Sequence, residues 1–559
     1  MNLSAVTHEC TLRFRQPIAR NQIQFRLLTA ARDCNAVTLH VWKRSEPYPE
    51  SVQTLPLEVR YSDGIRDEWV GNLLWPEEAH YLKYYFALRF ASGETKTFCE
   101  HGFDEAEPQG GAFELLQANE TDVPSSPAWC KGAVYYQIFP ERFAIGRQQS
   151  NLRDYVPWDS EPTRENFFGG DLQGIRQRLP YLAELGAECL YLNPIFAGDF
   201  NHKYATTDYL QIDPDFGDAD DLFALVSDAH QLGLRVILDG VFNHAGIHFA
   251  PFADVLTHGE ASTYREWFYI KRFPVAVDAA CYECVGDYPY MPRLRTANPD
   301  ARAYILRVML YWLKTAGIDG WRLDVADELD TGSMRYWREK IRKEYPDAVL
   351  LGETWGDASR MVCEGDQFDC AMNYLFRDAM VDFFATERID SAQLAARLSN
   401  MLMKYPDEVN HRMYNCLGSH DTARFLTVAG GETWRLRMAV AFQMLFPGSP
   451  AVYYGDELGM RGENDPGCRG GMAWEHGDGA LLAWTREMIG LRKASAAVRA
   501  GDYRALNVGR MKDVFAFERR AGDESVIAVF NRGSDPVTLD FADAGGRVTV
   551  PPQSVKIIP

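Results

Sequence analysis

GWRLD, at residues 320–324, decides the fold, because it is a short apolar run that ends in a carboxylate. Two other stretches have the same form, VLLGE at 349–353 and NCLGSHD at 415–421. Short apolar runs bounded by polar residues are typical of strands buried in a protein interior. A buried carboxylate is costly unless it is paired or used, so we expect the three terminal acids to share one site at the strand ends. These acids are Asp324, Glu353 and Asp421.

Eight such runs occur between residues 133 and 455, with segments of helical length between them. The candidate strands are AVYYQIF (133–139), ECLYLN (188–193), RVILDG (235–240), GWRLD, VLLGE, CAMNY (370–374), NCLGS (415–419) and AVYYG (451–455). Amphipathic stripes at 222–232 and 305–316 have the spacing of helices that cover a sheet. Eight strand–helix repeats predict an α/β fold, a (β/α)8 TIM barrel. A doubly wound open sheet is the alternative, but no glycine-rich phosphate turn follows the first strand.

The 559 residues are too many for one hydrophobic core, and the chain on either side of the barrel has a different pattern. Residues 1–122 and 499–559 contain short alternating runs without a helical period, which predicts an N-terminal and a C-terminal β-sandwich. The stretch DVPSSP at 122–127 is typical of a linker. The catalytic barrel is expected over 123–498, with residues 245–298 forming an inserted small domain after strand 3.

Charge and cysteine content limit the partners and the compartment. The chain has 58 basic and 78 acidic residues, and its net charge of −20 argues against nucleic acid or an anionic membrane as the main partner. The longest apolar region, 439–454, is too short and too interrupted by Pro and Gly to cross a bilayer. Eleven unevenly spaced cysteines are typical of free thiols, and no signal-peptide pattern begins the sequence, so we expect a cytoplasmic protein.

The residues around the first two acids suit two different roles. Arg322 and Asp324 are two apart on one strand, so both side chains point to the same face. A neighbouring guanidinium favours the ionised acid and should lower the pKa of Asp324, which suits a nucleophile. Glu353 lies beside Trp355, and apolar surroundings favour the protonated acid, which suits a proton donor. One ionised and one protonated carboxyl is the arrangement used in glycoside hydrolysis.

Each of these features alone has a structural explanation. A single strand-end Asp is more often a cap or an ion-pair partner, Arg322 could form a buried salt bridge, and Trp355 could belong to the core. The coincidence of three acids, one Arg and two histidines at strand ends, His244 and His420, favours a catalytic site.

Longer stretches around these residues resemble the α-amylase superfamily. DGVFNH (239–244), GWRLDVADE (320–328), GETW (352–355) and GSHD (418–421) are similar to its four ordered signature segments. Other stretches resemble the neopullulanase, cyclomaltodextrinase and maltogenic amylase group within it. They are YYQIFPERF (135–143), FFGGDLQGI (167–175), NHKYATTDY (201–209), MPRLRTANP (291–299) and YYGDELGMRGENDPGCR (453–469). The resemblance covers the whole chain and includes a starch-binding or dimerisation type of N-terminal sandwich.

The resemblance implies a role for each matching residue. Asp324 would attack the anomeric carbon, Glu353 would act as acid and then as base, and Asp421 would stabilise the transition state. The implied substrate-binding residues are Tyr204, Asp239, His244, Arg322, Trp355, His420, Asp465 and Arg469. Among them, Asp239 would orient Arg322, Trp355 would contact the acceptor side, and Asp465 and Arg469 would contact the next sugar toward the non-reducing end.

The implied activity is retaining hydrolysis of α-1,4-glucosidic bonds in cyclodextrins and maltodextrins, with pullulan and starch as further candidates. The resemblance also implies a homodimer in which the N-terminal sandwich of one subunit walls the active site of the other. That domain could instead be purely a carbohydrate-binding module. Two alternative functions are a 4-α-glucanotransferase and a non-catalytic carbohydrate-binding homologue. The second is disfavoured, because all three acids are present and no spanning segment is expected.

The chain departs from the family pattern at two places. Relatives often bind calcium just after PERF, but here Ile145 and Arg147 stand where oxygen ligands would be expected, and Gly169 and Asp171 alone make a poor cage. We therefore expect no calcium and no other metal or cofactor, and the lone Cys281–Cys284 spacing does not change this. The second departure is an acid, Asp327, where relatives commonly carry Asn, which leaves the ratio of hydrolysis to transfer open.

Overall fold

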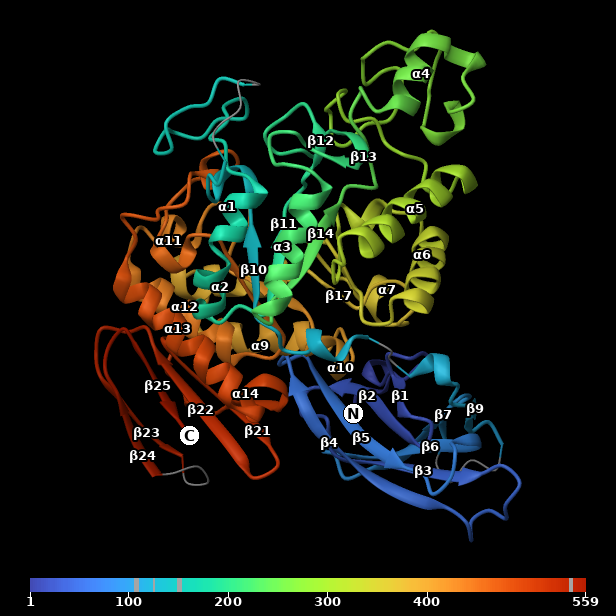
Figure 1. Cartoon of the computed structure of the whole chain (residues 1–559). Coiled ribbons are helices and arrows are strands. Elements are labelled where there is room, and N and C mark those ends of the chain that lie inside the picture. The colour runs from blue at the N-terminus through green and yellow to red at the C-terminus, as the bar shows by residue number, and fades with distance from the viewer. Residues whose placement is uncertain (105–109, 124–125, 148–152, 542–545) are drawn as a thin grey trace. The chain divides into compact units, whose positions relative to one another are not determined.

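The computed structural model describes the chain in five ranges, 1–104, 110–123, 126–147, 153–541 and 546–559 (Figure 1). These residues form two compact units. The first unit contains residues 1–126, 359–365 and 389–410, and the second contains 127–358, 366–388 and 411–559. Part of the expected linker, residues 124 and 125, lies outside the described ranges.

A closed parallel barrel forms the centre of the second unit. Its eight strands are β10 (Tyr135–Ile138), β11 (Cys189–Leu192), β14 (Arg235–Gly240), β15 (Gly320–Leu323), β16 (Val349–Gly352), β17 (Cys370–Ala371), β18 (Tyr414–Cys416) and β19 (Ser449–Tyr453). The strand order is β17-β16-β15-β14-β11-β10-β19-β18, and a parallel bridge from Met372 to Tyr414 closes the ring. Each strand lies within one of the eight predicted runs or overlaps it. The (β/α)8 barrel is therefore confirmed.

The barrel interior is filled by every second residue of its strands. Buried side chains at 189 and 191, 349 and 351, 370 and 372, and 414 and 416 belong to one apolar cluster that also contains Ile237. Two residues after Ile237 comes Asp239, so it points the same way, toward the barrel axis. Arg322 is likewise fully buried on β15. The layer of the barrel core nearest the carboxyl ends of the strands is therefore charged, whereas the layers nearer the amino ends are apolar.

Helices cover the outside of the barrel. They include α1 (Leu172–Gln177), α2 (Leu179–Leu185), α3 (Ala219–Gln231), α5 (Pro299–Thr315), α6 (Thr331–Glu344), α8 (Tyr374–Met380), α12 (Thr433–Leu445), α13 (Gly479–Ala494) and α14 (Ala496–Ala500). Both predicted stripes are buried along α3 and α5, with one exception. Leu232 is 46% exposed, because α3 has already ended and the chain turns away at Gly233, whose φ is +75°.

Two segments leave the barrel on the side of its strand carboxyl ends. The predicted excursion after the third barrel strand is present and contains α4 (Ala250–His258) and short 3-10 turns rather than a sheet (Figure 1). The second segment is an antiparallel pair, β12 (Phe196–Gly198) and β13 (Thr206–Ile212), which the sequence reading missed. In β13 the buried positions are three residues apart rather than alternating, so the sequence lacked the period of a strand.

The first unit is built on an antiparallel β-sandwich of nine strands. They are β1 (Arg15–Ala19), β2 (Gln22–Ala30), β3 (Cys34–Lys43), β4 (Gln53–Ser62), β5 (Arg66–Leu74), β6 (His80–Phe90), β7 (Thr95–Cys99), β8 (Gly102–Asp104) and β9 (Phe113–Gln117). The first half of β4 pairs with β3 and the second half pairs with β5, so one strand passes from one layer to the other. Side chains from both layers, among them Phe25, Leu39 and Trp69, share one core.

Helices α9 (Ser391–Leu402) and α10 (Asp407–Asn410) belong to the same unit as this sandwich. The fully buried guanidinium of Arg26 lies 3.2 Å from Glu68 on the neighbouring strand and 3.3 Å from Asp407 at the start of α10. Arg26 also donates to the carbonyl of Tyr405 at 3.0 Å. Removing one partner of this buried ion-pair group would leave an uncompensated charge in the interior. The contacts of Arg26 therefore fix α10 to the sandwich.

The C-terminal part of the second unit is a β-sandwich, as predicted. One sheet contains β20 (Asp502–Leu506), β21 (Val514–Ala521), β22 (Glu524–Asn531) and β25 (Ser554–Ile558), and the other contains β23 (Val537–Phe541) and β24 (Gly546–Val550). Both sheets contribute to one apolar core. The exact domain boundaries, at 122, 245–298 and 498, stay predictions.

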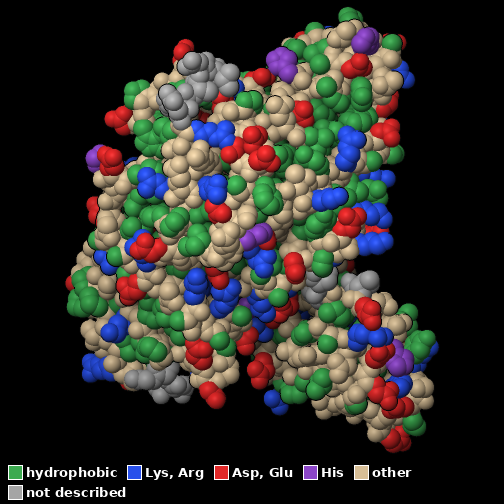
Figure 2. All heavy atoms as spheres, viewed as in Figure 1, with side chains coloured by type: hydrophobic (Ala, Val, Ile, Leu, Met, Phe, Trp, Pro, Cys, Tyr) green, Lys and Arg blue, Asp and Glu red, His purple; other side chains and the backbone are tan. Residues whose placement is uncertain are grey.

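On the face shown in Figure 2, acidic and basic side chains are intermixed over the described residues. No helix in the described part of the chain has both the length and the apolar character of a membrane span.

The packing of α5 on the barrel gives a first prediction. Trp312 is fully buried, stacks on Phe196 with ring centres 5.3 Å apart, and donates its indole N–H to the carbonyl of Tyr209 at 2.8 Å. Trp312→Ala should lower the free energy of unfolding by about 3–5 kcal/mol, because it opens a cavity and leaves that carbonyl unpaired. Urea denaturation would measure the loss. Lys314→Ala, on the exposed face of the same helix, should change stability by less than about 0.5 kcal/mol.

Candidate active site

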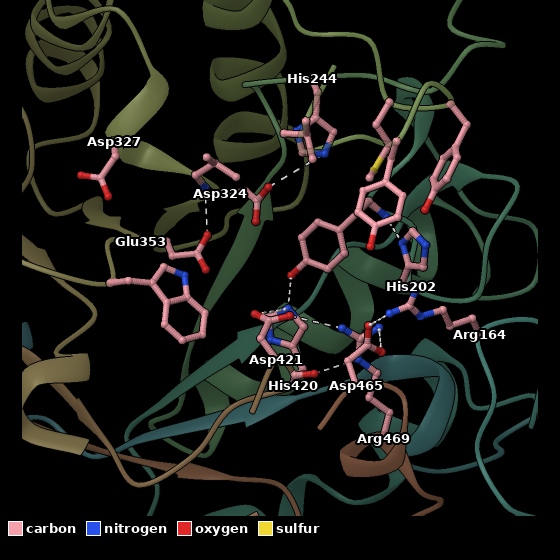
Figure 3. A pocket seen from close by; sticks show the side chains of 17 residues that line it. Arg164, His202, His244, Asp324, Asp327, Glu353, His420, Asp421, Asp465 and Arg469 are labelled. Carbon is pink, nitrogen blue, oxygen red and sulfur yellow. Dashed lines mark hydrogen bonds and ion pairs between the residues drawn. The ribbon is translucent and has the colours of Figure 1, made fainter. Parts of the chain in front are cut away.

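The three predicted acids meet at one cavity at the carboxyl ends of the barrel strands (Figure 3). Asp324 directly follows β15, Glu353 directly follows β16, and Asp421 lies in the loop after β18. The cavity has a volume of about 370 Å³. Nine of the eleven predicted site residues line it: Tyr204, His244, Asp324, Glu353, Trp355, His420, Asp421, Asp465 and Arg469. The remaining two, Asp239 and Arg322, are buried beneath the cavity, almost without exposure.

The guanidinium of Arg322 is the centre of the site. Its Nη1 donates to Asp324 at 2.8 Å and to both oxygens of Asp239, at 2.8 and 3.0 Å. Its Nη2 lies 2.9 Å from Oε2 of Glu353. The prediction that Arg322 lies beside Asp324 is therefore confirmed. The same arginine also holds Glu353, so the two carboxyls that face the cavity are neighbours on one planar group.

Asp239 holds the arginine in place from below. Its Oδ2 accepts hydrogen bonds from the hydroxyl of Tyr191 at 2.6 Å and from the hydroxyl of Tyr204 at 2.8 Å. Together with Arg322, these donors satisfy a carboxylate that is 1% exposed. Charge-assisted bonds of this kind are short and directional, so Asp239 fixes the plane of the guanidinium.

The expected lowering of the pKa of Asp324 is wrong in direction. Burial raises the pKa of Asp324 well above its ordinary value; Arg322 opposes this shift, and the charge of Glu353 adds to it. The physical reason is that one guanidinium is shared by three carboxylates, so its charge cannot compensate for the desolvation of each. Spacing along the strand revealed the arginine but not the two other acids that compete for it.

Glu353 is also held by the backbone after the neighbouring strand. The N–H of Val325 donates to Oε2 of Glu353 at 2.9 Å. Val325 has a φ of +45°, in the left-handed region that a β-branched residue rarely adopts. Strained backbone of this kind persists where the surrounding structure requires it. Here the strained conformation directs the N–H of Val325 at the carboxyl of Glu353.

Tyr204 and His420 form a stacked pair at the base of the cavity. Their rings are 5.4 Å apart with an angle of 4°, and the Tyr204 hydroxyl lies 2.6 Å from Nε2 of His420. The side-chain amide of Gln137 donates to Nδ1 of His420 at 2.8 Å. This bond assigns the hydrogen to Nε2, which faces Tyr204 and lies 3.2 Å from Asp421. Gln137 lies on β10 and was not predicted as a site residue.

The imidazoles around the cavity are neutral. Burial lowers the pKa of His244 to about 3 and the pKa of His202 to about 3, and burial with the nearby Arg469 lowers the pKa of His420 well below its ordinary value. Nε2 of His244 lies 4.0 Å from Asp324, and neither of its ring nitrogens has a side-chain hydrogen-bond partner among the described residues. A buried imidazole without a side-chain partner at a cavity wall is placed to bind a polar ligand.

A row of alternating charges runs away from the base of the cavity. Arg469, at the end of η10 (Gly467–Arg469), lies 3.2 Å from Asp421 and 2.9 Å from Asp465. Burial raises the pKa of Asp421, and Arg469 opposes the shift. Trp355 marks another wall, where its 52% exposed ring stacks on Tyr374 at 4.0 Å.

Sequence reasoning missed several residues that line the cavity. They are Arg164, His202, Val285, Tyr288, Tyr290, Met291 and Val325. Asp327, noted above only as a departure from the family pattern, lines it too. Four of the missed residues come from the inserted segment, which carried no regular pattern. Its density of aromatic residues was the signal that could have indicated them.

The expectation of no metal ion stays a prediction. The Asp171 carboxylate caps α1 through the N–H of Gly174 at 2.6 Å and accepts from the backbone of Gly146 and Arg147. Among the residues that the structure describes, no three His, Cys, Asp or Glu side chains are grouped as a metal site would require. Residues 148–151, part of the stretch considered for calcium, lie outside the described ranges.

Comparison with known proteins agrees with this architecture. Residues 137–498 match the family described as alpha amylase, catalytic domain, and residues 1–119 match the alpha amylase, N-terminal ig-like domain. A cyclomaltodextrinase of Geobacillus thermopakistaniensis is 40% identical over 98% of this chain and 94% of its own length. Neopullulanase 2 of Thermoactinomyces vulgaris is 40% identical with the same coverage of both chains.

A solved structure of a cyclomaltodextrinase superposes on the chain with a TM-score of 0.92, at 38% identity and over 96% of this chain and 93% of that one. The matched catalytic region covers more than half of the 559 residues and contains every residue of the cavity described above. The chain therefore belongs to the α-amylase family of glycoside hydrolases.

Proposed function

We propose that the protein is a retaining α-glucan hydrolase that cleaves α-1,4-glucosidic bonds in cyclodextrins and maltodextrins, with pullulan and starch as further substrates. The observation that carries this proposal is the contact of one buried arginine, Arg322, with both Asp324 and Glu353 at the cavity. Two carboxyls held side by side, one to attack and one to transfer a proton, are what double displacement at a sugar requires.

In the first step, a carboxylate oxygen of Asp324 bonds to the anomeric carbon as the glycosidic C–O bond breaks. The departing oxygen takes the proton of Glu353, and a covalent glycosyl-enzyme forms. In the second step, Glu353 takes a proton from water, whose oxygen bonds to the anomeric carbon and releases Asp324. The product keeps the anomeric configuration of the substrate.

The arrangement of charge supports this division of roles. Burial and the like charge of Glu353 raise the pKa of Asp324, so two adjacent ionised carboxyls are disfavoured here, and the first step needs only one of the two ionised. Asp421 would bind sugar hydroxyls and stabilise positive charge on the ring in the transition state. His244 and His420 would hydrogen-bond the sugar as neutral groups, and Tyr204 would stack on it.

The remaining substrate contacts follow from the two sides of the cavity. Asp465 and Arg469 would bind the next sugar toward the non-reducing end, and Trp355 would contact the sugar on the acceptor side. Arg322 and Asp239 would act by positioning the two carboxyls, because both lie beneath the lining residues. We also propose a cytoplasmic location, which the absence of any disulfide among the eleven cysteines supports, since all eleven lie in the described ranges.

Incubation with β-cyclodextrin, pullulan and soluble starch, with products resolved by chromatography, tests the function directly. Proton NMR of the first products should detect the α-anomer, because two displacements restore the configuration. Longer oligosaccharides as the main products from maltotriose would instead indicate a glucanotransferase. No cleavage of any of these glucans would contradict the proposal.

Removal of the nucleophile should abolish most of the activity. Asp324→Asn keeps the shape of the side chain but cannot form the glycosyl-enzyme, so kcat should fall about a thousandfold or more, equivalent to about 4 kcal/mol of transition-state stabilisation. Steady-state hydrolysis of β-cyclodextrin measures the change. Asp347→Asn, which alters an exposed acid just before β16, is the matched control and should stay near wild type. Near-normal turnover of Asp324→Asn would remove Asp324 from the mechanism.

The pH profile should report the burial of the acid pair. Asp324 must be ionised to attack, and its pKa is raised in the folded protein, so activity should increase with pH through a limb that lies above about 4, the ordinary value for Asp. The apparent pKa belongs to the pair rather than to one residue. The measurement is kcat/KM for a maltodextrin as a function of pH. A limb at or below pH 4 would contradict the raised pKa.

We propose in addition a homodimer that forms through the N-terminal sandwich. Ile65, just before β5, and Leu74, its last residue, are 77% and 68% exposed, so both are large apolar side chains that a second subunit could cover. The double variant Ile65→Glu/Leu74→Glu should shift the mass measured by light scattering from dimer to monomer, because it introduces charge into an apolar contact. Val277→Glu, at a 48% exposed position of the second unit, should leave the mass unchanged. A wild-type monomer would contradict the dimer.

A further inference from the structure

One end of the cavity is bounded by an ion pair that the reaction described above does not use. Nη2 of Arg164 lies 3.5 Å from Oδ2 of Asp465. Figure 3 shows this pair on one side of the cavity and Asp327 on the other, with Asp324 and Glu353 between them. Arg164 lies in the segment before α1, whereas Asp465 lies in the loop after β19. The pair therefore joins two loops across the mouth of the barrel.

Arg164 is the last member of the row of alternating charges. Asp421 contacts Arg469 at 3.2 Å, Arg469 contacts Asp465 at 2.9 Å, and Asp465 contacts Arg164. The side chain of Asp421 is 29% exposed, and over the next three members of the row exposure rises from 9% for Arg469 to 28% for Asp465 and 57% for Arg164. The row begins at a reacting acid and ends in solvent, so Arg164 stands where a bound chain of sugars would leave the cavity.

The backbone around Arg164 is held by buried side chains. Nη2 of Arg142 donates to the carbonyl of Asn166 at 2.9 Å and to its side-chain oxygen at 3.2 Å. The side-chain amide of Asn201 donates to the carbonyls of Thr163 and Asn166, at 3.1 and 2.8 Å. Arg142 and Asn201 are 1% and 3% exposed. Arg164 therefore projects from a fixed position, although its own side chain is open to solvent.

The ion pair itself contributes little to the stability of the fold. Exposed pairs of this kind are worth about 0–1 kcal/mol, because water screens the charges and two long side chains lose freedom. The hydrogen bonds to Thr163 and Asn166 would hold the backbone on both sides of Arg164 in the same conformation if the guanidinium were removed. A charged group that is fixed at a cavity mouth and not needed for folding is well placed to act on the ligand.

We propose that Arg164 closes the non-reducing side of the cavity and limits the part of an α-glucan bound there to two sugars. This inference rests on the proposed function. The first sugar lies over Asp324 and Asp421, and the second lies against Asp465 and Arg469. A third sugar meets the guanidinium of Arg164, which instead donates hydrogen bonds to the terminal hydroxyls of the second. Arg164 is thus a specificity-determining residue that favours release of a disaccharide.

Arg164→Ala tests this closure with maltohexaose that carries a label at its reducing end. The wild type should remove mainly two sugars in its first cleavage. In the variant, the share of first cleavages that remove three or more sugars should rise about fivefold, the factor that a contact of about 1 kcal/mol supplies. For maltotriose, KM should rise while kcat stays close to wild type, because Arg164 does not touch the reacting acids.

Arg461→Ala is the matched control, since Arg461 is an exposed arginine in the same loop as Asp465. It lies in a separate hollow and donates to the carbonyl of Gly431 at 3.3 Å. This variant should give the wild-type product pattern. Arg164→Lys keeps the charge with fewer donors and should fall between wild type and Arg164→Ala.

The outcomes separate this inference from the proposed function. A wild type that cleaves no α-glucan would contradict the function itself. An active wild type whose product lengths do not change in Arg164→Ala would overturn the closure alone. An equal loss of kcat on every substrate in that variant, with unchanged product lengths, would also overturn it, because it would indicate a purely structural role.

Discussion

The burial of one guanidinium among three carboxylates is the constraint on which the site depends. Arg322 has no exposed surface and contacts Asp239, Asp324 and Glu353 from its two terminal nitrogens. One positive charge cannot balance three buried negative charges, so this group of side chains favours retention of a proton. Asp239 has two further donors, the hydroxyls of Tyr191 and Tyr204, which favour its ionised form. Burial nevertheless raises the pKa of Asp239 as it does that of Asp324, so both of these carboxyls on Arg322 resist ionisation, and Asp324 is the one that faces the cavity.

A second buried ion pair positions the loops above this centre. Lys203 is fully buried, has a φ of +59°, and lies 2.8 Å from Asp213 and 3.6 Å from Asp215. Asp215 also pairs with Arg153, at the start of the segment that carries Arg164. One acid thus fixes the loop of Tyr204 and the loop that closes the cavity. Charged residues are rarely buried without a partner. Here the partners of Lys203 and Arg153 hold the two loops that form this wall of the cavity.

The sequence was sufficient to bring the three proposed catalytic acids to one cavity, because parallel strands of a barrel end at one face. Asp324, Glu353 and Asp421 each follow a recognisable apolar run, so the position of each along the chain implied its position in space. The raised pKa of Asp324 could not be predicted in the same way, because it depends on how many acids share Arg322 in three dimensions. Tyr288 and Tyr290 were missed for a related reason, since the inserted segment that carries them has no periodic pattern to reveal which side chains face inward.

The distribution of charge around the cavity explains how it could act on an uncharged substrate. The arginine of the acid pair and the row from Asp421 to Arg469 and Asp465 carry the fixed charges of the site, whereas the imidazoles of His202, His244 and His420 that line the cavity are neutral. Neutral donors and acceptors suit sugar hydroxyls in the ground state, because they bind without adding charge. In the proposed reaction positive charge develops on the sugar ring only during the displacement, and Asp324 and Asp421 already line the cavity. Groups held in this way need no reorganisation as the charge appears, so they stabilise the transition state more than the bound substrate.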